Sequence, residues 1–411
     1  MRAAPSTRLL VTVALCAMLA GCGKSSLPKA SEGTSSGTVP PVSAQGAVGV
    51  ATKNTTRLGG AEPISDAAAV ARAVYPGLTT ASRPRTVVLV DGHNWTAALT
   101  ASVLASAPLG APLLYSEGNT LPEATVEALR AMRPVGAATL GGAQVIRIGT
   151  TATVPEGLRT RSLPASGEPA TMAAAVANLL SLAHGGAAHQ VIVLVEGSPE
   201  ALQMPAAGLS AESGAPILLI TPGVVPAATA TVLRSLDQPA IYLLNPQAVN
   251  SDGLAALSRF GHVTPVVAGS TSAQANNPVE NADAVARFTD GSFGWGVKEP
   301  GHGLVFANAE RPLDAPASAL LSAIGDYGPL LLLESANALP PALASYLSDI
   351  QPAYSSAPQF QPVHGAYNHG WLIGDEHAIS AQTQAEIDSL LEITPRRVSP
   401  SEEEPVASPT E

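Results

Sequence analysis

A twelve-residue segment that occurs three times constrains this chain more than any other feature. The copies read LPEATVEALRAM from Leu121, VPAATATVLRSL from Val225 and LPPALASYLSDI from Leu339, so they begin 104 and 114 residues apart. Each copy starts with an aliphatic residue and Pro and then spaces its apolar residues as one face of a helix. Pro is tolerated in a first helical turn, where its missing N–H would be unpaired anyway. The spacing indicates one structural unit used three times.

Apolar runs without charge precede the three copies: APLL from Ala111, APILLI from Ala215 and GPLLLL from Gly328. Such runs are typical of parallel strands that are buried on both faces. Each unit also holds a first helix, another strand, an Ala-rich helix and a closing strand. The first helices are expected from Pro63, Pro169 and Pro278, and the closing strands from Ala137, Ala240 and Gly370. Alternating strands and helices predict α/β modules with parallel sheets and right-handed crossovers, flavodoxin-like or Rossmann-like.

The composition of the segments that flank the modules predicts that they are not folded. Gly, Ser, Thr and Pro dominate before Lys53, and the end of the chain is acidic and rich in Pro, so neither has enough apolar surface to offset ordering entropy. We therefore predict a signal peptide over 1–21, a flexible linker over 22–55, modules over 56–150, 151–262 and 263–393, and a disordered acidic tail over 394–411.

The N-terminus has the features of an export signal. Arg2 and Arg8 are followed by an apolar segment, Leu9 to Ala20, that ends in the sequence LAGC. Twelve helical residues span about 18 Å, which is too short for a hydrocarbon core of about 30 Å. LAGC resembles the lipobox of bacterial lipoproteins, which implies a lipid (palmitate among its acyl chains) on Cys22 and anchoring on the extracytoplasmic face of the cell membrane. The alternative is an ordinary signal peptide that contains a Cys.

Charge and cysteine content exclude several classes of function. Removal of Arg2 and Arg8 with the signal leaves 19 basic residues against 32 acidic ones, a formal charge of −13, which argues against nucleic acid as a partner. Cys16 would leave with the signal and Cys22 would become a thioether. We therefore expect no disulfide, no cysteine-bound metal and no thiol catalysis.

Several motifs resemble the bacterial cell wall-binding repeat 2 family of exported surface proteins. They are RLGGAEPISDAA from Arg57, GHNWTAAL from Gly92 with Ala97 in place of the family's Asp, AERPLDAP from Ala309, which keeps that Asp as Asp314, the prolines Pro112, Pro216 and Pro329, and the turn Gly141–Gly142. The resemblance covers Thr56 to Ile393. It implies non-catalytic modules that pack around a pseudo-threefold axis and attach to anionic polymers of the cell wall.

The candidate polymer-binding residues lie at expected strand and helix ends. Asp91, His93, Asn94 and Trp95 follow the strand from Thr86, where ligands of open α/β sheets bind. Alternatively, Asn94 caps the next helix and Trp95 packs between modules. Asp314 has the same ambiguity, because a carboxylate at a helix N-terminus is stabilised by free N–H groups. Arg57 and Arg161 lie near module starts, where they could meet polymer or pair with acids of a neighbouring module.

Motifs for catalysis are missing: the chain has no phosphate-binding loop, no HExxH and no Gly-x-Ser-x-Gly. His364 and His369 lack a third ligand at a recognisable spacing, so no metal and no cofactor are expected. The sequence favours a lipid-anchored, non-enzymatic protein of the cell envelope that binds cell-wall polysaccharide or another anionic wall polymer as a monomer with an intramolecular pseudo-trimer. The alternative is a lipid-anchored solute-binding protein for a transporter, which requires two lobes joined by hinge segments.

Overall fold

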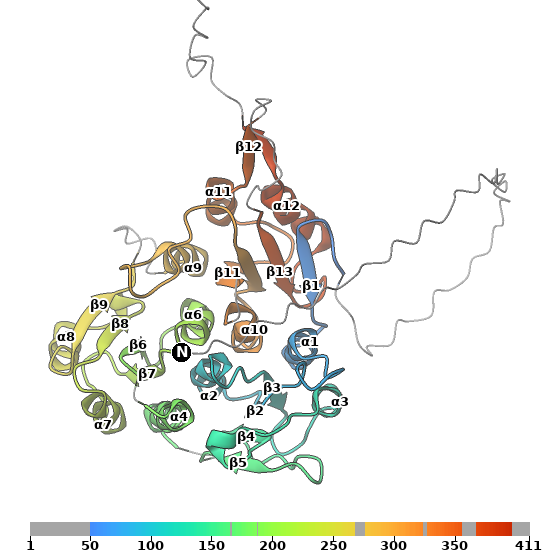
Figure 1. Ribbon diagram of the computed structural model, residues 1–411. Helices are drawn as coiled ribbons and strands as arrows, with labels where there is room; N and C mark the ends of the chain where they lie inside the picture. The colour runs from blue at the N-terminus through green and yellow to red at the C-terminus, as the bar shows by residue number, and fades with distance from the viewer. Residues whose placement is uncertain are drawn as a thin grey trace, which may run out of the picture. The chain divides into compact units, whose positions relative to one another are not determined.

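The computed structural model describes residues 50–164, 167–186, 188–267, 276–323, 327–355 and 367–396. The signal segment, Cys22, most of the linker, His364 and the residues after 396 lie outside the described residues. Parallel strands form three four-stranded sheets with helices between the strands (Figure 1). This confirms the predicted α/β class with three modules. A short pair, β12 (Ala353–Ser355) and β14 (Thr394–Arg396), adds a strand where the tail was expected to begin.

The three sheets share one strand order. The first sheet runs β3 (Leu113–Ser116), β2 (Val87–Asp91), β4 (Val145–Ile148), β5 (Thr160–Ser162). The second runs β7 (Ile217–Ile220), β6 (Gln190–Val195), β8 (Ala240–Leu243), β9 (His262–Pro265). The third runs β11 (Tyr327–Leu333), β10 (Gly303–Asn308), β13 (His369–Ile373), β1 (Thr55–Leu58). This order is the first part of a flavodoxin-like sheet.

The last strand of each sheet lies at or beyond the expected boundary of the module that holds the other three. β5 follows the expected module boundary at 150 and β9 begins at the one at 262, yet each pairs with the sheet before its boundary. β1 opens the first module and completes the third sheet, with Thr56 opposite Trp371 and Leu58 opposite Ile373. The boundaries predicted from the repeat spacing remain a prediction, and strand exchange now links the three units in a closed cycle.

The apolar runs become β3, β7 and β11, each at one edge of its sheet. All four residues of β3 and of β7 are buried, as are Leu330 to Leu333 of β11. The first helix of each module packs against this strand: α1 (Pro63–Val74) on β3, α4 (Pro169–His184) on β7 and α9 (Pro278–Arg287) on β11. Helix packing against these strands explains why edge strands carry apolar residues.

The repeated segment forms α3 (Glu123–Met132), α7 (Ala227–Ser235) and α11 (Pro341–Asp349). The Pro that opens each copy is the N-cap residue and not part of the first turn, with ψ near 150° at Pro122 and Pro226. Thr125 and Thr229 hold two of these helices, because each hydroxyl donates over 2.6 Å to a strand carbonyl, that of Tyr115 or Leu219.

Three equivalent helices contact one another between the sheets. They are α2 (Trp95–Ala101), which continues as the 3₁₀ turn η1 (Ser102–Ala105), α6 (Pro205–Ser213) after the short α5 (Glu200–Gln203), and α10 (Asp314–Ser322). Ala207, Gly208, Ala315 and Ala319 are small enough to let the helix axes approach closely. The remaining elements are α8 (Ser251–Leu257), α12 (Ala381–Leu391), η2 (Ala138–Leu140) and η3 (Pro246–Ala248).

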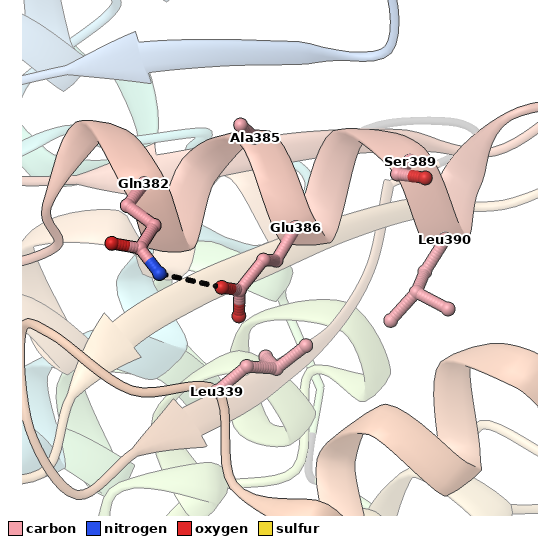
Figure 2. A pocket seen from close by; sticks show the side chains of 6 residues that line it. All are labelled: Leu339, Gln382, Ala385, Glu386, Ser389 and Leu390. Carbon is pink, nitrogen blue, oxygen red and sulfur yellow. Dashed lines mark hydrogen bonds between the residues drawn. The ribbon is translucent and has the colours of Figure 1, made fainter.

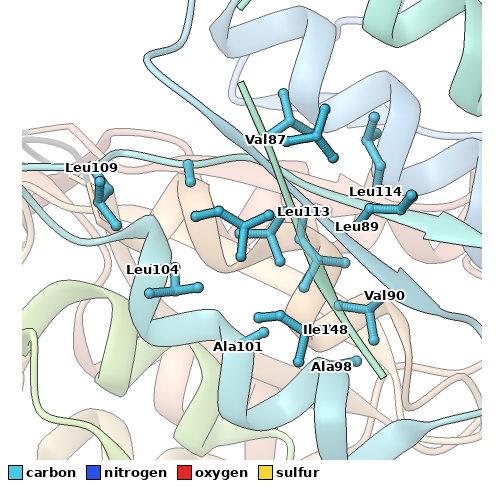
Figure 3. Packing of buried hydrophobic residues seen from close by; sticks show 14 of the residues in the cluster. Val87, Leu89, Val90, Ala98, Ala101, Leu104, Leu109, Leu113, Leu114 and Ile148 are labelled. Carbon is cyan, nitrogen blue, oxygen red and sulfur yellow. The ribbon is translucent and has the colours of Figure 1, made fainter. Parts of the chain in front are cut away.

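The core of the first module shows how strands and helices join. In Figure 3, Leu113 of β3 lies on the same side of the strands as Ala101 and Leu104 of α2 and η1, whereas Leu89 and Leu114 lie on the other side. Met172 of α4 belongs to the same cluster, although it is numbered in the second module. Burying each such large apolar side chain contributes roughly 1.5–3 kcal/mol. The core therefore crosses the expected module boundary, as the strands do.

Candidate functional site

The carboxyl ends of β1, β10 and β13 meet the first turns of α1 and α10. We call this region the 3–1 seam, formed by residues 59–66, 308–314 and 374–378. Gly59 has φ 132° and Gly374 has φ 97°. A Cβ at Gly59 would lie 2.2 Å from Asp66 Oδ1 and 2.7 Å from the Gly374 nitrogen, so only glycine allows this approach. Ligands of parallel α/β sheets bind at this end of the strands, and the seam is one such place.

Asp66, Arg311 and Asp314 form a charged cluster inside the 3–1 seam. The Arg311 Nε donates to Asp314 Oδ2 over 2.8 Å, and its Nη2 donates to Asp66 Oδ2. The third nitrogen, Nη1, donates to the Ala61 carbonyl oxygen over 2.9 Å, while the Gly60 N–H donates to Asp66 Oδ1 over 2.6 Å. Both aspartates are fully buried, and the Arg311 side chain is 16% exposed. The cluster joins the first helix of module one to the second helix of module three.

Burial raises the pKa of both carboxyl groups of the cluster, and Asp314 raises that of Asp66 further, whereas a hydrogen bond with Asp66 lowers that of Asp314. Burial, followed by the charge of Asp314, raises the pKa of Asp66 to about 9, against the opposing effects of Arg311 and the Gly60 N–H. Burial also raises the pKa of Asp314, and Arg311 opposes it. One guanidinium therefore faces two buried acids, and the raised pKa of Asp66 favours its protonated form at neutral pH. Both acids are inaccessible, so they cannot exchange protons with an external substrate.

Arg57, for which the sequence suggested either polymer or an acid of a neighbouring module as partner, lies inside the protein. It is only 6% exposed, and its guanidinium donates five hydrogen bonds within the protein. The acceptors are Gln384 Oε1, which receives two, and the carbonyl oxygens of Gly374, Asp375 and Ile379. The side chain fastens β1 to the segment between β13 and α12. Asp314 is likewise internal, because its carboxylate pairs with Arg311 inside the seam.

Asp91, His93, Asn94 and Trp95 lie together after β2, as predicted, with divided roles. The Asn94 side chain accepts from the Ala97 N–H over 3.0 Å and caps α2. Trp95 is half-buried and packs against the apolar cluster that contains Leu209 and Leu320. These contacts agree with the cap-and-packing alternative for both residues.

Asp91 and His93 form an Asp-x-His turn that remains open to solvent. His93 donates from its backbone N–H to Asp91 Oδ1 over 3.1 Å, and its Nδ1 lies 3.0 Å from the same oxygen. Partial burial works to raise the pKa of Asp91, but the hydrogen bonds from His93 and Gly118 outweigh it and lower that pKa. The imidazole is 74% exposed. The ionised Asp91 thus orients an imidazole toward solvent.

A second Asp-x-His turn follows β13, and the sequence analysis missed it. Asp375 Oδ1 accepts from the His377 N–H over 2.9 Å, and Asp375 Oδ2 lies 3.0 Å from His377 Nδ1. Partial burial opposes ionisation of Asp375, but the hydrogen bonds from His377 lower the Asp375 pKa, and the imidazole is 91% exposed. The signal was present as DGH from Asp91 and DEH from Asp375, one at the last residue of β2 and the other two residues after β13.

Arg161 is not brought to either turn. It lies half-buried on β5 opposite Ile146 of β4, which in turn pairs with Val88 of β2. Asp91 is three residues further along β2, so Arg161 is two strands away and short of the sheet's carboxyl end. His369 lies on β13, where its Nε2 is 3.0 Å from the Thr56 hydroxyl. In the described ranges no three His, Cys, Asp or Glu residues gather in a way that suits a metal.

A shallow groove lies elsewhere, on α12. Leu339, Ala385 and Leu390 give it an apolar floor, with Gln382, Glu386 and Ser389 beside them, and its volume is about 470 Å³. Figure 2 shows the Gln382 amide donating to Glu386 along the helix, over 3.1 Å. The groove is open and lacks converging polar groups, so it does not resemble a small-molecule site. Among the described helices, none is both long enough and apolar enough to cross a bilayer.

Solved structures of two other proteins have a similar fold. Cwp6 from Clostridium difficile matches with a TM-score of 0.62 and 18% identity, covering 82% of this chain and 48% of Cwp6. Cwp8 from the same organism matches with a TM-score of 0.58 and 14% identity, covering 83% of this chain and 52% of Cwp8. The chain thus spans about half the length of each. No family model matches the sequence, and no curated protein matches it. The cell wall-binding repeat 2 resemblance therefore rests on the motifs, and the solved structures share the three-module α/β fold.

Proposed function

We propose that this chain is a non-catalytic protein of the cell envelope that binds an anionic cell-wall polymer through its three modules. The observation that carries the proposal is the fold, which extends over most of the chain and is shared with the cell wall proteins Cwp6 and Cwp8. The short apolar segment and LAGC support a lipid anchor on Cys22, which would hold the modules at the outer face of the membrane.

The contacts with polymer belong to loops after the strands, because the strands themselves are buried. Arg57 and Asp314 are used internally, so we assign contact to His93 and His377, the exposed members of the two Asp-x-His turns. Each imidazole is fixed through Nδ1 and presents Nε2 to solvent, where it can donate to a phosphate or carboxylate when protonated. Two turns on different strands allow a repetitive polymer to make several weak contacts, whose effects combine through effective concentration.

The solute-binding alternative is not supported by the strand pairing. A two-lobed receptor would close two domains around a cleft, whereas the described strands form three sheets with exchanged strands. The groove on α12 is too open to bury a small solute on most of its surface.

The proposal is tested by retention of the soluble chain, residues 23–411, on purified cell walls. We expect retention on intact walls, loss after the anionic polymers are stripped, and about fivefold or more weakening in His93→Ala/His377→Ala, the size of a typical charge-assisted contact. Glu123→Ala, a change on the exposed face of α3, serves as control. Equal retention by stripped walls would refute the polymer as ligand. Separately, Cys22→Ala should move the full chain from the membrane to the soluble fraction, and unchanged membrane association would refute the lipid anchor.

A further inference from the structure

The same helical position is buried at all three junctions between modules. Each first helix begins with Pro, and the fourth residue is Asp66 in α1, Met172 in α4 and Asn281 in α9. Their exposed fractions are 0%, 6% and 6%. Each helix contacts the second helix of another module: α1 contacts α10, α4 contacts α2, and α9 contacts α5 and α6. The fourth residue is thus an equivalent contact position in a repeated junction.

The chemistry at this position differs from junction to junction. Met172 packs in the apolar cluster of the first module. The Asn281 side chain donates to the Leu202 carbonyl oxygen over 2.8 Å, which is a neutral hydrogen bond. Asp66 instead enters the charged cluster with Arg311 and Asp314. Of the three described helices, only α1, at the 3–1 seam, has an ionisable residue at this fourth position.

The 3–1 seam is also the junction that joins the two ends of the folded chain. The junction between modules one and two and the junction between modules two and three connect segments that are adjacent in sequence. In the 3–1 seam, by contrast, β1 pairs with β13, which follows it by more than 300 residues. Next to β1, Lys53 Nζ lies 2.5 Å from Glu392 Oε1, and the Asn54 N–H donates to Asp388 Oδ1 over 2.7 Å. Closing this junction costs more loop entropy than closing the other two, because its partners are further apart along the chain.

We propose that Asp66, Arg311 and Asp314 form a proton-dependent latch that holds the first module against the third and releases it as the pH rises. Arg311 can neutralise one carboxylate. The second carboxyl group is neutral only while it keeps its proton, and loss of that proton would leave a net negative charge buried in the seam. Asp314 Oδ1 is buried, and no N–H group of the described residues donates to it, so a second negative charge there would lack a donor.

The groups that surround the latch do not supply that compensation. From β3, the Tyr115 hydroxyl donates to the Leu313 carbonyl oxygen over 2.7 Å, and burial followed by Asp314 and Asp66 raises its pKa, so it stays neutral. From β1, Arg57 faces Asp375 and Glu376. Exposed carboxylates lie at the rim, on Glu62, Glu310 and Glu376, with His377 beside them. Near the seam, carboxylates therefore outnumber the cationic groups that could neutralise a second negative charge.

The direction of the pH effect follows from proton binding. The pKa of Asp66 is about 9 in the closed seam and near its ordinary value of 3.8 once the seam opens into water. The closed form then binds more protons, so its stability relative to the open form is greatest below about pH 4 and falls as the pH rises toward 9. Each pH unit in that window changes the opening equilibrium by up to about tenfold.

Hydrogen exchange at the seam tests the latch in the soluble chain 23–411. After correction for intrinsic exchange, we expect protection of the β1 and α1 amides to fall about tenfold or more between pH 6 and pH 9. Asp314→Asn leaves one carboxylate for one guanidinium, so its protection should change less than about twofold over the same range. The amides of β6, in the second module, provide the internal reference.

Asp283→Asn is the matched control, because Asp283 is another buried aspartate of module three and burial raises its pKa to about 7. This variant should keep the wild-type pH dependence at β1 and α1. If Asp314→Asn does not fold, Asp66→Asn removes the other carboxyl group and should give the same loss of pH dependence. A pH response of β1 and α1 that persists in both seam variants, or protection that does not fall in the wild type, overturns the proposal.

Discussion

At the scale of single residues, the sequence identified the unusual side chains but not their partners. Arg57 was noticed because an arginine opens a module, and the acceptors of its guanidinium lie 317 to 327 residues later. A local sequence pattern contains no information on partners so far away along the chain, so the interior role of Arg57 could not be predicted. The cap formed by Asn94 could be predicted, because it depends on the three following residues.

Arg57→Ala should therefore lower stability and not merely weaken binding. Five hydrogen bonds are lost, and buried carbonyl groups of Gly374 and Ile379 lose their donors, which predicts a loss of about 2–4 kcal/mol in the free energy of unfolding. Urea denaturation measures it. The control, Arg130→Ala on the exposed surface of α3, should stay within about 0.5 kcal/mol of wild type. Equal effects of the two changes would contradict an interior role for Arg57.

At the scale of elements, periodicity predicted the type and order of most helices and strands. The three repeated helices, the apolar strands and the first helices were all found, since each depends on residues close in sequence. The closing strand expected from Ala137 begins instead at Val145, after the 3₁₀ turn η2, because Gly141 and Gly142 adopt positive φ. Strand order was not predicted, because pairing such as β1 with β13 is decided by tertiary packing.

The contact between α6 and α10 offers a test at this scale. A Cβ at Gly208 would lie 2.7 Å from Ser322 Oγ and 3.2 Å from Ser322 Cβ, so Gly208→Ala should destabilise the protein by about 1–3 kcal/mol.

Two further variants identify the cause. Ser322→Ala removes the clashing oxygen together with its hydrogen bond to the Gly328 carbonyl, so the double variant should lose less than the sum of the single losses. Gly186→Ala, where a Cβ meets nothing within 4 Å, should be nearly neutral. If the stability losses of the two single variants simply add in thermal or urea unfolding, the clash with Ser322 is not the cause of the loss in Gly208→Ala.

At the scale of the whole described chain, the pairing of β1 with β13 joins the beginning of the folded chain to its end in one sheet. Each sheet needs a strand from the module that follows it, and β1 supplies the third sheet with the strand that no later module provides. A repeat count alone predicts three modules in a row. The family resemblance implied packing around a pseudo-threefold axis, but the pairing of β1 with β13 could not be read from the sequence, because a tandem array and a closed cycle have the same local patterns.

Carbodiimide coupling tests this closure most directly, because it converts an ion pair in contact into an amide. Lys53 and Glu392 lie on the two ends that the closure brings together, with 2.5 Å between Nζ and Oε1. In dilute soluble chain 23–411, mass spectrometry should find an amide between these two residues within monomers, and Glu392→Gln should abolish it. Coupling of Lys53 to other acids only, or a Lys53–Glu392 amide confined to covalent dimers, would contradict the closed cycle.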